Sequence, residues 1–218
     1  MRFARLQPDP TVLAFDTSAA HCAAALLSGD HVLRAETRKM AKGQAEALMP
    51  MLQEMLTDAN LRWQDLTCLG VGIGPGNFTG IRISVSAARG LALGLNLPAV
   101  GVCTLEALAE GHQGPSIALC DARRSAVYAQ GFNGIDLAPQ QLSAEELHDL
   151  RAKHPDAPLI GSDMDDGVST QAPKMPLAVA IARIAARSAK PNLKPPAPLY
   201  LRAADAAPAK PAATLLDK

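Results

Sequence analysis

A dense run of glycines is the strongest local signal of chemistry in this sequence. It reads Gly72-Ile-Gly-Pro-Gly-Asn-Phe-Thr-Gly-Ile-Arg82, and its candidate loop residues are Gly74, Gly76, Thr79, Gly80 and Arg82. A loop of this kind can hold a phosphate on backbone N–H groups at the positive end of a following helix. It can equally be a turn whose lack of Cβ atoms lets it approach another segment closely. It is not a Walker A loop, because no Lys-Ser or Lys-Thr follows the last glycine. Both interpretations stay open.

The residues that bind metals or act as nucleophiles form no recognisable set. The four cysteines are scattered without a C-x-x-C pair, which excludes a zinc ribbon and a thioredoxin-type dithiol, and they are expected to be small buried thiols in a reducing compartment. The five histidines show no i, i+4 pairing. Ser84 and Ser86 lie in a predicted helix with no histidine placed by the sequence to activate them. We therefore expect neither a metal site nor protease chemistry.

Composition narrows the function classes further. The 218 residues include 48% apolar residues, enough for a proper core, and 21 basic residues balance 21 acidic ones. No global positive field draws in nucleic acid or an acidic membrane face, and 3% aromatic residues leave few platforms for stacking bases. The N-terminal residues have the pattern of neither a signal peptide nor a membrane span. We expect a cytoplasmic protein that does not bind membranes.

The elements that would position the glycine loop follow from hydrophobic periodicity. Three strands are predicted, at 11–16, 21–27 and 31–37, with Gly29-Asp30 at the second reversal. A helix over about 43–60, a strand at 66–73, a helix at 78–95 and a strand at 99–103 follow. This order is that of the ribonuclease-H-like lobe of actin-like ATPases and sugar kinases. The expected fold is α/β, with two lobes of mixed β-sheet flanked by helices.

The second half of the chain gives weaker signals. A hairpin is predicted from strands at 116–121 and 125–132, with helices near 143–152 and 176–189. The predicted domains are an N-terminal lobe at 11–103, a smaller lobe at 104–190, a Pro-rich linker and return segment at 191–205, and a disordered tail at 206–218.

Asp16, Thr17 and Ser18 end the first predicted strand. Sugar kinases and actin-like ATPases place an acidic residue and hydroxyls here, near nucleotide phosphate and its Mg²⁺. The alternative is a polar turn whose hydroxyls bond to backbone, and we favour it because the usual glycine-rich hairpin tip is missing. A remnant of a nucleotide loop is the other interpretation.

Several of these segments together resemble the TsaB family, a subunit of the bacterial complex that installs threonylcarbamoyladenosine in tRNA. The resemblance covers roughly residues 12–110, with a fainter echo at Pro198–Arg202. It is carried by the end of the first strand at Asp16-Thr17-Ser18, the helix beginning Gln44-Ala-Glu-Ala-Leu-Met-Pro-Met-Leu, the Gly74–Arg82 loop, and Pro98-Ala-Val-Gly-Val-Cys-Thr-Leu-Glu106.

The resemblance implies a partner rather than a reaction. TsaB resembles TsaD, the catalytic subunit, which has a His-x-x-x-His metal pair where this chain has Thr104 and Leu108. A hydroxyl and an alkyl group cannot replace two imidazoles as ligands. We therefore expect a pseudo-enzyme that binds no cofactor itself, with ATP and metal on the partner subunits. The implied partners are a TsaD-like subunit and a TsaE-like ATPase, with tRNA contacted only indirectly and a homodimer as an alternative state of the chain alone.

The expected contact with the TsaD-like partner is a helical bundle built on the two predicted helices of the first lobe. Small side chains recur at successive turns of the second helix, which favours close helix packing. The predicted interface residues are Leu48, Met51, Met55, Ile83, Ala87, Gly90, Leu91 and Gly94. Two other functions fit the same fold: an autonomous metallopeptidase or glycoprotease-like hydrolase, and a small-molecule kinase or ATPase.

Overall fold

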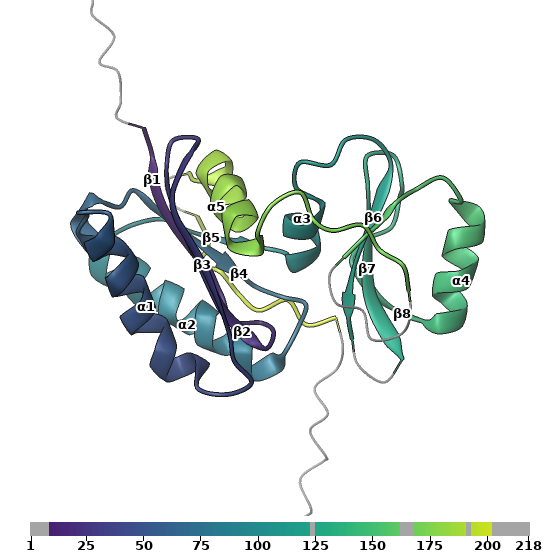
Figure 1. Ribbon diagram of the computed structural model, residues 1–218, viewed down its shortest axis with the longest axis horizontal. Coiled ribbons are helices and arrows are strands. Elements are labelled where there is room, and N and C mark those ends of the chain that lie inside the picture. Colours follow the sequence, from purple (N-terminus) through teal and green to yellow (C-terminus); the bar gives the residue numbers. More distant parts are fainter. Residues whose placement is uncertain (1–8, 123–124, 162–167, 191–192, 202–218) are drawn as a thin grey trace, which may run out of the picture.

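A computed structural model describes residues 9–122, 125–161, 168–190 and 193–201, which form two lobes, each with one mixed β-sheet (Figure 1). The first sheet has the order β3-β2-β1-β4-β5 and the second β8-β7-β6-β9. The strands of the first sheet are β1 (Thr11–Asp16), β2 (His21–Ser28), β3 (His31–Lys39), β4 (Cys68–Gly72) and β5 (Ala99–Val102). Its helices are α1 (Gln44–Asp58), a short 3-10 turn at Trp63–Asp65, and α2 (Phe78–Leu95).

The order of elements in the first lobe confirms the prediction. β1, β2 and β3 form an antiparallel meander whose second reversal passes through Gly29 at a φ of 56°. β4 pairs parallel to β1, and β5 pairs parallel to β4. The carboxyl ends of these three parallel strands therefore lie at one edge of the sheet, where the turn after β1 and the glycine loop after β4 meet.

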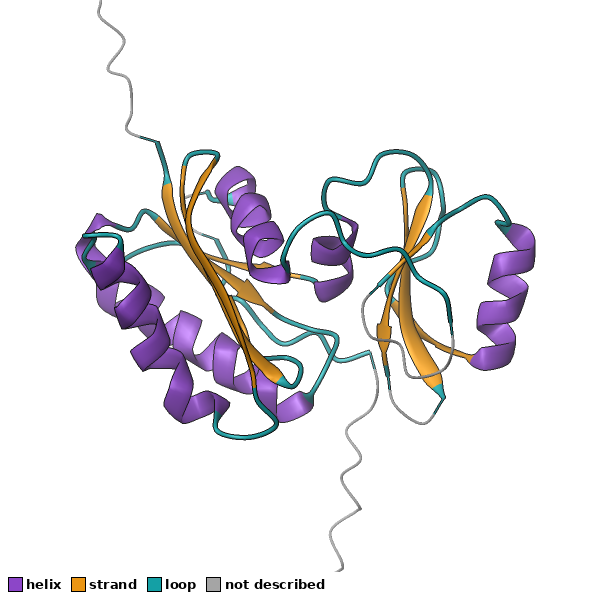
Figure 2. Ribbon diagram, viewed as in Figure 1, coloured by secondary structure: helices purple, strands orange, loops and turns teal. Residues whose placement is uncertain are grey.

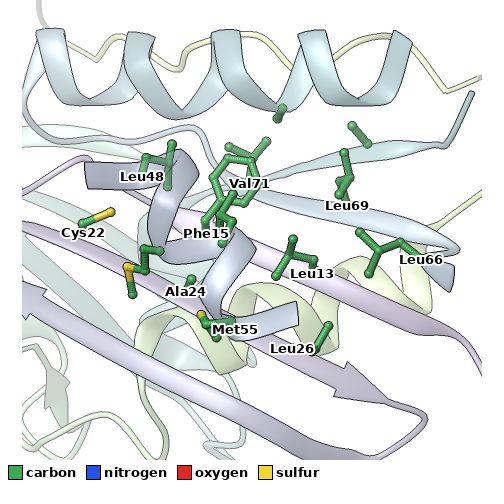
Figure 3. Packing of buried hydrophobic residues seen from close by; sticks show 14 of the residues in the cluster. Leu13, Phe15, Cys22, Ala24, Leu26, Leu48, Met55, Leu66, Leu69 and Val71 are labelled. Carbon is green, nitrogen blue, oxygen red and sulfur yellow. The ribbon is translucent and has the colours of Figure 1, made fainter. Parts of the chain in front are cut away.

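Side chains alternate between the two faces of the first sheet, and helices cover both faces (Figure 2). Leu13 and Phe15 of β1 pack in one core cluster with α1 and α2. Val12 and Ala14 pack in another cluster with α5 (Leu177–Ser188). The lobe is thus a three-layer sandwich, and Figure 3 shows its α1 side, where Leu48 and Met55 lie beside the sheet residues.

The position of α5 corrects the predicted domain boundary. The helix itself forms as expected, but it packs on β1, β2, β4 and β5 of the first lobe rather than within the second. Cys68 of β4 lies in the same cluster as Ala178 and Ile181. The range 104–190 is therefore not a single lobe, because the chain returns to the first sheet with α5 to cover its open apolar face.

The second lobe contains the predicted hairpin. Its strands are β6 (Ser116–Asp121), β7 (Ala126–Phe132), β8 (Gln140–Ser143) and β9 (Leu159–Ile160), and its helix is α4 (Ala144–Lys153). Ser143 caps α4 by accepting a hydrogen bond from Glu146 N at 3.2 Å, while Glu146 reaches back to Ser143 N. The short helix α3 (Thr104–Ala109) joins the lobes. Neither β8, β9 nor α3 was predicted, since each is too short to show a period.

The segment at 193–201 returns to the first lobe and runs beside the glycine loop. Leu199 N donates to Ile73 O at 2.8 Å, and Pro196 is buried against Gly101 of β5. The predicted tail at 206–218 lies outside the described residues and stays a prediction. No helix in the described part of the chain has both the length and the apolar character needed to cross a membrane.

Candidate functional site

Asp16 organises the turn at the end of β1. Its side chain is fully buried, and Oδ1 accepts hydrogen bonds from Ser18 N at 2.9 Å, Ser18 Oγ at 2.9 Å and His21 Nε2 at 2.8 Å. Oδ2 has no partner among the described residues. The polar-turn interpretation is met only in part, because Ser18 Oγ bonds to the Asp16 carboxylate rather than to backbone, and the Thr17 hydroxyl bonds to the backbone of a distant residue, Gly80.

The glycine loop packs directly on this turn. Thr17 Oγ1 donates to Gly80 O at 2.7 Å, and Asn77 N donates to Ser18 O at 2.6 Å. A Cβ on Gly76 would press on the Ser18 carbonyl, and one on Gly80 would overlap the Thr17 carbonyl. These glycines therefore permit close approach of two backbones within the chain.

Gly72 makes the same kind of contact at the end of β4. A Cβ there would overlap Oδ2 of Asp16, so a side chain at this position would displace the carboxylate. The two sequence motifs, which were interpreted separately, form one compact structure at the edge of the sheet.

The N-terminus of α2 uses its backbone donors inside the chain. Asn77 Oδ1 accepts from Gly80 N at 3.0 Å, and Asn77 O accepts from Ile81 N at 2.9 Å. The side chain of Asn77 thus satisfies a donor that a phosphate would otherwise bind. Thr79 is exposed beside this cap, and Gly74 O accepts from Thr104 N at 2.8 Å.

Thr104 and Leu108, at the positions of the predicted family's metal pair, are built into the junction between the lobes. Leu108 is buried in a cluster with Tyr128 and Ala118 of the second lobe. Thr104 is buried as well, and its Oγ1 has no hydrogen-bond partner among the described residues. Glu106, between them, has its pKa raised by burial. The described residues contain no group of three or more His, Cys, Asp or Glu side chains that could hold an ion.

The four thiols are all free. Cys22 and Cys68 are buried, as expected, whereas Cys103 and Cys120 are half-buried. Burial raises the pKa of Cys22 and of Cys68 to about 11, and it raises the pKa of the other two as well. A thiol is nucleophilic only as the thiolate, so these groups have little reactivity near neutral pH.

The predicted interface residues separate into two groups. Leu48, Met51 and Met55 are buried in the core of the first lobe, so their assignment to a partner surface is wrong. The periodicity that singled them out reports the apolar face of α1, and that face covers the chain's own sheet.

The outward side of α2 remains accessible to a partner. Gly90 and Gly94 are exposed, and a Cβ on either would meet no described atom within 4 Å. Ile83, Ala87 and Leu91 are half-buried and pack partly on the core. Leu93, which was not predicted, is 86% exposed. We call Ile83, Ala87, Gly90, Leu93 and Gly94 the outer face of α2.

Three further side chains form an exposed cluster at the start of α2. Phe78 and Tyr200 stack with ring centroids 4.8 Å apart, and the Arg82 guanidinium lies 3.9 Å from the centre of the Phe78 ring. Arg82 Nε donates to Tyr200 Oη at 3.0 Å. The sequence pattern singled out Arg82 but not the side chains of Phe78 and Tyr200. The available signal was their rarity. Because aromatic residues are so few in this chain, one that lies on the surface points to a function there.

The sequence of this chain is similar to proteins of the TsaD and TsaB families. The family model for TsaD, described as tRNA N6-adenosine threonylcarbamoyltransferase, matches residues 34–206. The TsaB protein of Bacillus subtilis is 34% identical over 163 residues, which cover 70% of this chain and 71% of that protein. The TsaB protein of Escherichia coli is 38% identical over 122 residues, 54% of this chain. That match spans about half of the relative, 52% of its length.

Solved structures show the same fold. YeaZ from Pseudomonas aeruginosa aligns with a TM-score of 0.51 at 29% identity, covering 62% of this chain and 65% of that one. A protein described as similar to peptidase YEAZ from the same organism aligns with a TM-score of 0.64 at 23% identity, covering 88% of this chain and all of that one. The order of elements in the first lobe, an antiparallel meander followed by two parallel strands that each come after a helix, is the order predicted for a ribonuclease-H-like lobe. By its family-model match and its relatives, this chain belongs to the TsaB family of the TsaD-like proteins.

Proposed function

We propose that this chain is a non-catalytic subunit of the complex that forms N6-threonylcarbamoyladenosine in tRNA, and that it pairs with a TsaD-like catalytic subunit and activates it. The names of its relatives support the pathway. In this proposal the chain binds no cofactor, and ATP and metal belong to the partner subunits. A TsaE-like ATPase joins the same complex, and tRNA is contacted through the partner.

The observation that carries the proposal is the outer face of α2. Gly90, Leu93 and Gly94 are exposed and Ile83 and Ala87 only half-buried, although α2 also contributes an inner face to the core. The axes of two packed helices usually lie about 8–10 Å apart, and glycines at successive turns allow the short end of this range. A helix from another chain would find here both open space and apolar surface.

The junction between the lobes supports a role without metal chemistry. Thr104 and Leu108 present a hydroxyl and an alkyl group in place of imidazoles, and Leu108 packs in an apolar cluster. The glycine loop packs on the chain's own Asp16–Ser18 turn. This contact accounts for the need for glycines in the loop without a bound nucleotide. Neither the hydrolase nor the kinase alternative gains an observation in its favour.

The test is reconstitution of tRNA modification from purified TsaD-like, TsaE-like and adenylate-forming proteins of the same cell, with and without this chain. We expect modified adenosine to form at a much higher rate when the chain is present. Equal rates with and without the chain would contradict the proposal. Homodimer formation by the chain alone can be followed by sedimentation in the absence of the partner.

A further inference from the structure

The guanidinium of Arg82 is held in place by two aromatic side chains. Its central carbon lies over the Phe78 ring, its Nε donates to Tyr200 Oη, and the described residues place no carboxylate on its two terminal nitrogens. Phe78 and Tyr200 are each partly exposed, and Arg82 is exposed. Arg82 is therefore exposed while its Nε and central carbon contact the two rings, and these contacts restrict the conformations of its side chain.

A shallow groove surrounds this guanidinium. Phe78, Thr79, Arg82, Ile83 and Ser86 line it, so apolar surface and two hydroxyls lie beside a single positive charge. Ile83 belongs both to the groove and to the outer face of α2, so the groove continues the surface that is proposed to bind the partner. Tyr and Arg are among the residues that contribute most of the binding energy at protein interfaces, and Phe is enriched there.

We infer that the Arg82 groove receives an acidic side chain, Asp or Glu, from the protein that docks on the outer face of α2. A planar guanidinium forms paired hydrogen bonds with a carboxylate, and prior fixation by Phe78 and Tyr200 reduces the entropy lost on binding. RNA phosphate is the other anion that an arginine recognises. The carboxylate is favoured because the chain has no net charge to attract a polyanion and the groove is largely apolar.

This inference rests on the proposed function, and the experiment separates the two. Calorimetric titration with the TsaD-like protein is done for the wild type, Arg82→Gln, Gly90→Arg and a matched control, Arg151→Gln, on exposed α4 of the second lobe. We expect Arg82→Gln to weaken pairing about 10- to 100-fold, as loss of an interfacial arginine anchor does. The Kd of the wild type should also rise more steeply with salt than that of Arg82→Gln. Arg151→Gln should bind like the wild type.

A second variant tests the fixation of Arg82 rather than its charge. Tyr200→Phe keeps the stacked ring and removes only the hydroxyl that accepts from Nε, so pairing should weaken less than in Arg82→Gln, and circular dichroism should show an unchanged fold.

Normal pairing by Arg82→Gln together with weak pairing by Gly90→Arg would overturn the Arg82 inference and leave the proposed function standing. Normal pairing by Arg82→Gln with weaker tRNA binding by the assembled complex would assign the groove to RNA and also overturn it. A wild type that does not pair would overturn both.

Discussion

The glycines that lead into α2 and the glycines near its end have opposite surroundings. Gly80, in the first turn of α2, lies against the Thr17 carbonyl. Gly72 and Gly76 also contact the Asp16–Ser18 segment. Gly90 and Gly94, further along the helix, face open space. In the first group the close neighbour belongs to this chain, and in the second no atom of the described residues lies close by. A small residue thus marks a place of close approach, but its environment decides whether the approaching group is internal or belongs to a partner.

Alanine substitutions give the largest difference between the two groups. Gly80→Ala puts a methyl group into the Thr17 backbone, which cannot move without breaking the hydrogen bond from Thr17 Oγ1 to Gly80 O, so we expect a loss of about 3 kcal/mol in the free energy of unfolding. Gly90→Ala, in the exposed helix interior, should instead gain about 0.5–1 kcal/mol. Urea unfolding of both variants measures the difference. If Gly80→Ala and Gly90→Ala had similar free energies of unfolding, the two glycines would not differ in their surroundings as described.

The carboxylate under the glycine loop is the next largest contribution. Asp16→Ala removes the acceptor of three hydrogen bonds and leaves buried donors of Ser18 unpaired, so we expect a loss of about 2 kcal/mol. Asp58→Ala on the exposed side of α1 is the matched control and should change stability by less than about 0.5 kcal/mol. If both variants unfold alike, Asp16 does not stabilise the turn.

Buried thiols make the interior of the first lobe sensitive to alkaline pH. Cys22 and Cys68 have a folded pKa of about 11 and an unfolded value near 9.0, so the folded state binds these protons more tightly. The contribution of these thiols to the free energy of unfolding is constant below the pKa of the unfolded state. It is lost as pH rises through the pKa of the folded state, and about 1 kcal/mol per thiol is already lost near pH 10. The double variant Cys22→Ala, Cys68→Ala should lose stability less steeply over this range. Parallel pH profiles, measured by chemical denaturation, would show that burial of these thiols does not matter.

Local signals in the sequence predicted the first lobe well. The bounds of α2 agree with the prediction because Asn77 caps its start and Asn96, in the left-handed region at a φ of 54°, ends it before Pro98. The meander followed from alternating apolar runs and the Gly29-Asp30 reversal. Each of these features depends on neighbours in the sequence.

Features set by contacts distant in the sequence could not be predicted. Periodicity identified the apolar face of α5 but not the sheet that it covers, since both lobes offer an apolar face. Leu48 and Met55 carried the same ambiguity between core and interface. The contact of Gly80 with Thr17 joins residues far apart along the chain, and no local pattern encodes it.

The outer face of α2 is tested most directly by Gly90→Arg. The site has room for a side chain, so the variant should fold with the wild-type circular dichroism spectrum and melting temperature. Sedimentation velocity of each protein mixed with the TsaD-like subunit then reports pairing. We expect the wild type to sediment as a complex and Gly90→Arg to bind about 100-fold more weakly, because an arginine there would hold the two helices apart. A folded Gly90→Arg variant that forms the complex as the wild type does would contradict the account.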